Sequence, residues 1–211
     1  MIPTKEEWNN ALEERHGKEL HQVFSSATVA ICGLGGLGSN IAIALARAGL
    51  GKLILIDFDR VDITNLHRQQ YKAEQIGMYK TVALAENLKE IAPYISLEIH
   101  TERITEDNVL TFLKDADIIC EAFDDAECKA MLTEIVLTEM RDKYLVAASG
   151  MAGLYDANRI KTRKVTSRFY LCGDEESDVA DGLGLVSSRV MVCAAHQAHT
   201  VLRILAKQFE V

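Results

Sequence analysis

The sequence predicts an α/β protein with a Rossmann-like, mostly parallel sheet flanked by helices, and three observations support this class. Apolar, strand-like runs alternate with helical patterns along most of the chain. A glycine-rich turn at residues 33–38 separates the first such run from a helical pattern. Two strand-like segments near the C-terminus, 158–162 and 167–172, are expected to be antiparallel and to make the sheet mixed.

The bulk composition predicts one domain over residues 1–211, long enough and apolar enough to bury a sizeable core. The formal net charge of -8 argues against a surface that coats nucleic acid. The five cysteines are widely spaced with no CxxC pair, so neither a disulfide framework nor a structural zinc site is expected. With no apolar signal core and no run of transmembrane length, we expect a reduced, cytoplasmic protein with no membrane contact.

Residues 1–25 are predicted to form an N-terminal helical arm, with Thr4 as its N-cap and acids in the first turn. Its apolar positions make only a partial stripe. Arg15 lies in this arm, and two interpretations of it remain open. The arm is either a solvated helix that packs on the core or on a partner, or it carries Arg15 to a phosphate.

A βαβ unit follows at residues 29–59. An apolar strand, the glycine-rich turn, a helix to Gly49 and a second apolar strand succeed one another, and the second strand ends in Asp57 and Asp59. Asp57 stands about 20 residues beyond the glycines, where a carboxylate can accept hydrogen bonds from ribose hydroxyls. The order of these parts predicts nucleotide binding, for which NAD is the default ligand; residues further along the chain favour ATP.

Each glycine of the turn is expected to have its own task. Gly33 permits the tight turn, Gly35 lets a phosphate approach the backbone, and Gly38 lets the helix pack closely on the strand. The helix that starts near Gly36 presents unpaired N–H groups and a positive dipole end to the phosphate.

A polar stretch lies just past the second strand, at the sheet edge where open α/β proteins bind ligands. It contains Asn65, Arg68 and Gln69. An ordinary turn can be this polar, but an arginine so soon after a ribose-binding acid suggests a phosphate clamp. Lys80 opens the next helix, where a lysine opposes the helix dipole; a bound anion would explain it, although an exposed surface lysine is slightly favoured.

Further along, the apolar strand 116–122 runs straight into Phe123-Asp124-Asp125. These acids fall beside the nucleotide crevice, where Mg²⁺ takes carboxylates together with phosphate oxygens. Asp is also a good N-cap for the helix expected at 126–141, and the two roles can coexist in adjacent residues.

The remaining elements complete the sheet. We expect a strand at 144–148, the antiparallel pair, an acidic loop at 173–184 and a closing helix at 186–209. The loop is interpreted as mobile, or as a docking surface for a carrier protein. His196 and His199 in the last helix lack further ligands nearby and are taken as packing or surface residues.

The ordered set of glycines, acids, Asn65, Arg68 and Lys80 resembles the ThiF/MoeB family, the bacterial relatives of ubiquitin-activating enzymes. The resemblance covers roughly residues 15–205. It rests on the stretches 33–39, 56–62, 64–69 and 77–80 and on the strand end at Asp124. It implies adenylation: the C-terminal Gly-Gly carboxylate of a small ubiquitin-like sulfur carrier, such as a ThiS-like protein of thiamine biosynthesis, attacks the α-phosphorus of ATP.

The resemblance also implies roles for single residues. Asp57 would hold the ribose, Asn65, Arg68 and Lys80 the phosphates, and Asp124 the Mg²⁺ ion. Asp59, Gln69 and the four glycines would complete the nucleotide site. Family members are homodimers in which an arginine before the first strand reaches the partner's nucleotide, and Arg15 is the candidate for that role.

The chain departs from the longer family members in two ways. It lacks their two zinc-binding CxxC pairs, and only Cys172 stands roughly where they carry a cysteine that takes the activated carrier. A thiol beside so many acids is expected to have a raised pKa, so Cys172 is a weak candidate for sulfur transfer. Other readings stay open: a MoaD-like carrier, a small-molecule or tRNA-attached carboxylate, an NAD-dependent oxidoreductase, or an inactive module that binds a ubiquitin-like protein.

Overall fold

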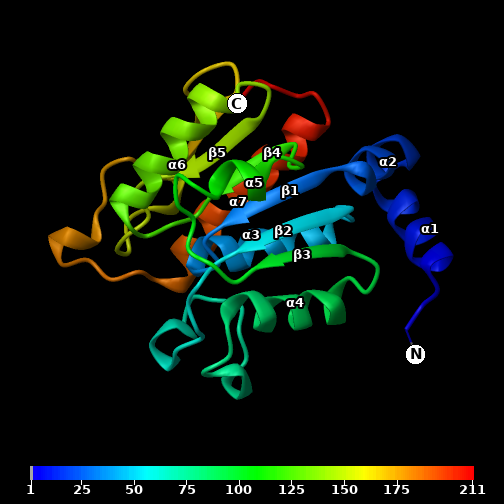
Figure 1. The fold of residues 1–211 in the computed structure, drawn as a ribbon, viewed down its shortest axis with the longest axis horizontal. Helices are drawn as coiled ribbons and strands as arrows, with labels where there is room; N and C mark the ends of the chain where they lie inside the picture. Colours follow the sequence, from blue (N-terminus) through cyan, green and yellow to red (C-terminus); the bar gives the residue numbers. More distant parts are fainter. Residues whose placement is uncertain (1) are drawn as a thin grey trace.

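A computed structural model describes residues 2–211 and shows one seven-stranded sheet with the order β3-β2-β1-β4-β5-β7-β6 (Figure 1). Neighbouring strands run parallel except for β6, which is antiparallel to β7. The predicted fold class is therefore confirmed. The strands are β1 (Thr28–Cys32), β2 (Lys52–Ile56), β3 (Ser96–His100), β4 (Ile118–Glu121), β5 (Tyr144–Ala148), β6 (Lys161–Lys164) and β7 (Phe169–Gly173).

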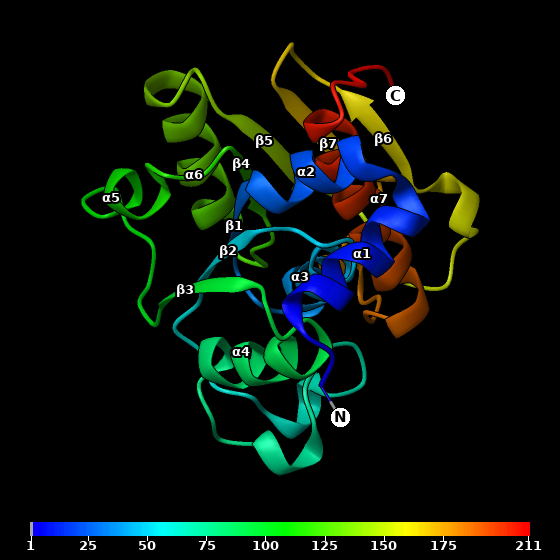
Figure 2. The same ribbon diagram turned by 90° about the vertical axis from the view of Figure 1, so that its right-hand side faces the viewer.

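Helices cover both faces of the sheet, as Figure 2 shows from the side. Alternate residues of each strand point to opposite faces, so β1 sends Val29 and Ile31 into one apolar cluster and Ala30 and Cys32 into the other. The first cluster also holds α3, α4 and α7, and the second holds α5 and α6. The helices are α1 (Lys5–His16), α2 (Lys18–Ser26), α3 (Gly36–Arg47), α4 (Lys80–Ile91), α5 (Val109–Leu113), α6 (Ala126–Glu139) and α7 (Ser187–Leu205).

The N-terminal arm is two helices rather than one, because Gly17 between α1 and α2 has φ 86°, a left-handed value that glycine tolerates. The predicted cap is present: the Thr4 hydroxyl accepts from the Glu7 N–H, and the Glu7 carboxylate accepts from the Thr4 N–H. α1 buries none of its residues completely. Leu12 packs near Gly49, which places α1 at the amino ends of the strands.

Two element boundaries differ from the expectation. The predicted strand at 158–162 begins only at Lys161, because Asp156 accepts a hydrogen bond from the Asn158 N–H and folds Ala157–Arg159 into a 3₁₀ turn. The closing helix expected over 186–209 already ends at Leu205. Within residues 2–211, no helix is both long enough and apolar enough to cross a membrane.

The acidic loop at 173–184 is held to the body of the protein by ion pairs, which the sequence does not reveal. Glu175 pairs with Arg163 and Glu176 with Arg159. Asp174 pairs with Arg189 of α7, and both side chains are almost fully buried. These pairs neutralise three of the loop's acids, which weakens the interpretation of the loop as an acidic docking surface.

Candidate functional site

A pocket of about 590 Å³ opens at the carboxyl ends of β1, β2, β4 and β5. β1 lies between β2 and β4, so the strand order reverses here, and open α/β sheets bind ligands at such a switch point. Ten of the residues expected from the sequence line the pocket: Gly33, Gly35, Gly36, Asp57, Asp59, Asn65, Arg68, Gln69, Lys80 and Asp124.

The glycines of the turn differ in what surrounds them. A Cβ on Gly33 would lie 2.7 Å from the Ala122 carbonyl oxygen, and one on Gly38 would lie 1.9 Å from the Gly33 carbonyl oxygen. The protein backbone therefore needs both glycines. A Cβ on Gly35 would meet only Gln69 Nε2, at 3.7 Å, so the space beside Gly35 is open to a ligand, as the sequence predicts.

Asp57 holds the glycine-rich turn as well as facing the pocket. Its carboxylate accepts a hydrogen bond from the Leu34 N–H at 2.6 Å and another from the Asp59 N–H at 2.7 Å. Burial raises the pKa of Asp57, and the Lys80 ammonium and the two N–H donors oppose that rise. Each carboxylate oxygen can accept more than one hydrogen bond, so a ribose hydroxyl can still bind.

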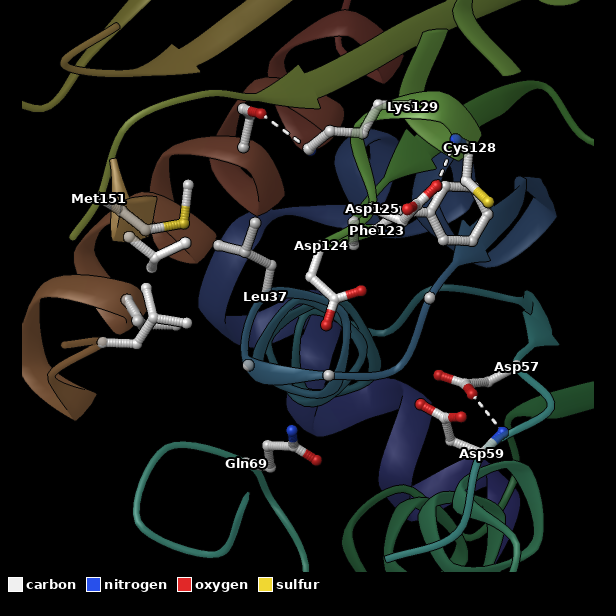
Figure 3. A pocket seen from close by; sticks show the side chains of 18 of the residues that line it. Leu37, Asp57, Asp59, Gln69, Phe123, Asp124, Asp125, Cys128, Lys129 and Met151 are labelled. Carbon is white, nitrogen blue, oxygen red and sulfur yellow. Dashed lines mark hydrogen bonds between the residues drawn. The ribbon is translucent and has the colours of Figure 1, made fainter. Parts of the chain in front are cut away.

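Lys80 is buried, so the interpretation of it as a surface lysine is wrong. Its ammonium lies 2.7 Å from Asp59 Oδ2 and 4.0 Å from Asp57 Oδ2. The two carboxylates account for a lysine in the first turn of α4. They also aim its charge at the pocket, because Asp57 and Asp59 both line it (Figure 3).

Three residues of the polar stretch, Asn65, Arg68 and Gln69, line the pocket beside the first turn of α3. Arg68 lies over the first turn of α3, since a Cβ on Gly36 would be 3.5 Å from its side-chain carbons. Asn65 lines the same side. Gln69 is buried, yet its Oε1 has no hydrogen-bond partner in the described part of the chain. A buried amide oxygen without a partner beside an open pocket fits a ligand that supplies a donor.

Asp124 and Asp125 have separate tasks, as the sequence allowed. Asp125 is the N-cap of α6, because its carboxylate accepts from the Cys128 N–H at 2.8 Å. Asp124 points into the pocket above the glycine-rich turn (Figure 3) and is exposed. Among residues 2–211 no three His, Cys, Asp or Glu side chains converge on a metal position. The residues nevertheless fit Mg²⁺ as one carboxylate plus phosphate oxygens and water, the usual set for this ion.

Sequence reasoning missed an ion pair at the far side of the pocket. The Lys129 ammonium lies 2.8 Å from each Glu121 carboxylate oxygen and donates to the Ala148 carbonyl at 3.1 Å. Burial raises the pKa of Glu121, and Lys129 opposes the rise. The pair ties the carboxyl ends of β4 and β5 together. Its only signal in the sequence is a charged residue within an apolar strand.

The sequence also gave no reason to single out Phe58 and Arg103. The Arg103 guanidinium carbon lies 4.4 Å from the centre of the Phe58 ring, and both residues line the pocket beyond Asp57. Together they form a flat surface of the kind on which a purine base stacks.

Two candidates from the sequence lie away from the pocket. Cys172 is fully buried in β7, where burial raises its pKa, so it cannot serve as an accessible thiol. The pKa direction matches the expectation, but its cause is burial rather than nearby acids. Arg15 lies on α1 at the amino ends of the strands, opposite the loops that form the pocket (Figure 1). The structure therefore does not bring Arg15 together with the other residues of its own chain's site.

The arrangement suits a nucleoside triphosphate. Lys80 and Arg68 supply positive charge beside an open glycine turn and the N-terminus of α3, where phosphates bind. Asp57 supplies a ribose acceptor, and Asp124 supplies a carboxylate for a divalent ion. Such a site can position a phosphate ester and neutralise charge that develops on it.

Comparisons with known proteins agree with this geometry. Residues 9–211 match the ThiF family. The Adenylyltransferase and sulfurtransferase MOCS3 of Caenorhabditis briggsae is 33% identical over 113 residues, which is 53% of this chain and 28% of that protein. The tRNA threonylcarbamoyladenosine dehydratase of Escherichia coli (strain K12) is 32% identical over 148 residues, which is 69% of this chain and 54% of that protein. The chain thus spans only part of the length of these relatives.

Solved structures share the fold. The crystal structure of the E. coli tRNA N6-threonylcarbamoyladenosine dehydratase TcdA in complex with ATP superposes with a TM-score of 0.86 at 22% identity, covering 99% of this chain and 98% of that chain. That of E. coli MccB with AMPCPP and MccA gives 0.70 at 22% identity, covering 90% and 59%. Since the family match extends over nearly the whole sequence, this chain belongs to the ThiF family.

Proposed function

We propose that this protein is an ATP-dependent adenylyltransferase that activates a carboxylate, and that its acceptor is the C-terminal Gly-Gly of a ThiS-like sulfur carrier used to make the thiamine thiazole. One observation carries the proposal. Asp124, Lys80 and Arg68 line one pocket around a glycine turn whose central position, Gly35, is left open by the protein.

The reaction needs little chemistry from side chains. A carboxylate oxygen of the acceptor bonds to the α-phosphorus of ATP, and the bond from that phosphorus to the oxygen bridging toward the β-phosphate breaks. Pyrophosphate leaves with the electron pair, and the acyl-adenylate remains. The attacking carboxylate is already ionised at neutral pH, so positioning and charge neutralisation are sufficient.

In this proposal, residues on different sides of the pocket divide these tasks. Asp57 accepts from the ribose, and the surface of Phe58 and Arg103 supports the base. Asn65, Arg68 and Lys80 hold phosphate oxygens. The Lys80 ammonium rests on Asp59 at 2.7 Å and is therefore already aimed into the pocket before a phosphate arrives.

Asp124 would hold Mg²⁺, which would bridge phosphate oxygens and neutralise part of their charge. An NAD-dependent oxidoreductase would have no task for Asp124, Lys80 and Arg68 together, which disfavours that alternative.

A tRNA-attached carboxylate is the second candidate, favoured by the likeness to TcdA over nearly the whole of both chains. The net charge of -8 disfavours it, because binding to RNA depends on neutralising phosphates with Lys and Arg.

We further propose a homodimer in which Arg15 completes the partner's site, since Arg15 is exposed and lies far from the pocket of its own chain (Figure 1). Mixing inactive Arg15→Ala with inactive Lys80→Met tests this proposal. Heterodimers would have one intact site of two, so about a quarter of the wild-type activity should return. If the mixture stays inactive although the two variants exchange subunits, the proposed role of Arg15 in the partner's site is contradicted.

Exchange of labelled pyrophosphate into ATP, with Mg²⁺ and a purified Gly-Gly carrier, tests the proposed activity. We expect exchange that depends on the carrier and disappears in Asp124→Ala. Glu127→Ala is the matched control, because Glu127 is an exposed acid three residues away that does not line the pocket. Absence of exchange with any carrier, or equal losses in both variants, would refute the proposed roles.

A further inference from the structure

The pocket is divided by polarity into two halves. The acids and cations that would hold the nucleotide lie on one side, and the other side is apolar. Figure 3 shows Asp57 and Asp59 on the first side, Leu37 and Met151 on the second, and Asp124 between them. The apolar half is lined by Leu37, Met151, Ala152, Val179, Leu185 and Val190.

This apolar wall is fixed by the core of the protein. Leu37 and Val190 are buried members of the larger core cluster, and Met151 and Leu185 pack against that cluster. They come from the first turn of α3, the connection after β5, and the start of α7 with the loop before it. The wall therefore exists before any ligand binds and need not be ordered by one.

The wall begins directly beside the glycine turn. A Cβ on Gly36 would lie 3.0 Å from Val190 Cγ1. An acceptor whose carboxylate reaches the phosphates above this turn must therefore place the groups next to its carboxylate against Val190 and its neighbours.

The charges of this half are already compensated. The Lys129 ammonium is bound by Glu121 and by the Ala148 carbonyl. Among the lining residues of the described chain, Lys80 and Arg103 stand on the nucleotide side. Arg68 lies at the border between the two halves, because a Cβ on Gly36 would be 3.5 Å from its side-chain carbons and 3.0 Å from Val190 Cγ1. Asp178, at the edge of the apolar half, is exposed and negative. Arg68 is thus the one uncompensated cation of the described lining that an RNA backbone would meet at this half, and it stands only at the border. A neutral apolar chain would lose little solvation against the wall itself.

We propose that the apolar half is the acceptor subsite and that it selects a peptide C-terminus with an apolar side chain just upstream of its terminal glycines. The inference rests on the proposed adenylation and names the chemistry of its acceptor. The terminal carboxylate reaches Asp124 and the turn, and the apolar side chain packs on Leu37, Met151 and Leu185. Affinity changes about fourfold for each methylene fully buried. Leucine has three carbons beyond Cβ, and a wall that covers about half of their surface makes leucine bind on the order of tenfold more tightly than serine.

The experiment has two steps. ATP is first titrated into the protein to measure nucleotide affinity. Three synthetic heptapeptides are then titrated, each into protein saturated with a non-hydrolysable ATP analogue. The peptides differ only in the third residue from the end: Leu-Gly-Gly, Ser-Gly-Gly or Asp-Gly-Gly. Met151→Gln and Leu185→Gln probe the wall. Leu154→Gln is the matched control, because Leu154 is a highly exposed residue of the same connection as Met151 and does not line the pocket.

We expect the leucine peptide to bind about tenfold more tightly than the serine peptide, with the aspartate peptide weakest. Both wall variants should lose most of this preference and keep ATP affinity within about twofold, and Leu154→Gln should behave as wild type. Equal binding of the three peptides, no peptide binding at all, or an RNA stem-loop that binds in a Met151-dependent way would each overturn the inference. Failure to bind ATP would instead refute the proposed function.

Discussion

Substitution of Gly35 by alanine should separate nucleotide binding from folding. A methyl group at Gly35 would contact only Gln69 Nε2, at 3.7 Å, which is an ordinary van der Waals distance. Its φ of -76° is not left-handed, but its ψ of -145° lies outside the main regions open to L-residues, so an alanine there carries some backbone strain. We therefore expect Gly35→Ala to lower the free energy of unfolding by about 1–3 kcal/mol, through backbone strain alone.

The same methyl would project into the space where a phosphate approaches the turn. Forcing a methyl into a filled contact costs about 1–3 kcal/mol. ATP affinity should therefore fall by roughly 5- to 150-fold. Isothermal titration with ATP and urea denaturation measure the two quantities on the same preparation.

Gly38→Ala is the matched comparison, because Gly38 belongs to the same turn but is expected to serve close packing of the helix on the strand rather than a ligand. Its Cβ would lie 1.9 Å from the Gly33 carbonyl oxygen, whereas ordinary contact begins at 3.4 Å. We expect a loss of more than about 4 kcal/mol in the free energy of unfolding, or no folded protein. A Gly35→Ala protein that binds ATP like wild type, or that is destabilised as much as Gly38→Ala, would refute the reasoning.

Three other predictions concern buried charges. Burial alone raises the pKa of Asp174, but N–H donors, the Ser177 hydroxyl and Arg189 outweigh it and lower the pKa to about 2. The carboxylate therefore contributes about 2 kcal/mol above pH 4 that is lost as the pH falls toward 2, and urea denaturation across this range should show the decline. Arg189→Met should cost about 3–5 kcal/mol at pH 7 in the same assay, and a loss below 1 kcal/mol would contradict the role of the buried pair. Lys129→Met leaves Glu121 buried without a cation. Because burial already raises the pKa of Glu121, the variant should be least stable at high pH and should regain stability as the pH approaches 5 and the carboxylate is protonated. A loss of stability that does not depend on pH would count against this account.

Much of the fold could be predicted because local patterns agree with it. Apolar runs form the central strands β1, β2, β4 and β5, and the order of β1 and β2 with the glycine turn fixes the βαβ unit. The differences arise where a single polar contact decides a boundary, as with Asp156 and the 3₁₀ turn before β6. Gly17 likewise divides the arm, through a backbone conformation that a helical pattern does not reveal.

Most of the predicted nucleotide site lines one pocket because carboxyl ends of parallel strands meet at one edge. Lys80 was misjudged as a surface residue because its partner Asp59 lies 21 positions away and meets it only in the folded chain. Cys172 was a weak candidate from the sequence, and its burial agrees with that. Its position in the sequence does not reveal that β7 is covered so that the thiol is completely enclosed.

The sequence by itself determined the fold class, the glycine turn and most of the polar residues that line the pocket beside it, since these follow from short-range pattern and strand order. Tertiary structure alone decided which charges are neutralised in pairs and where the apolar half of the pocket lies. The physical reason is that close contact, burial and charge compensation depend on residues distant in sequence, which only packing brings together.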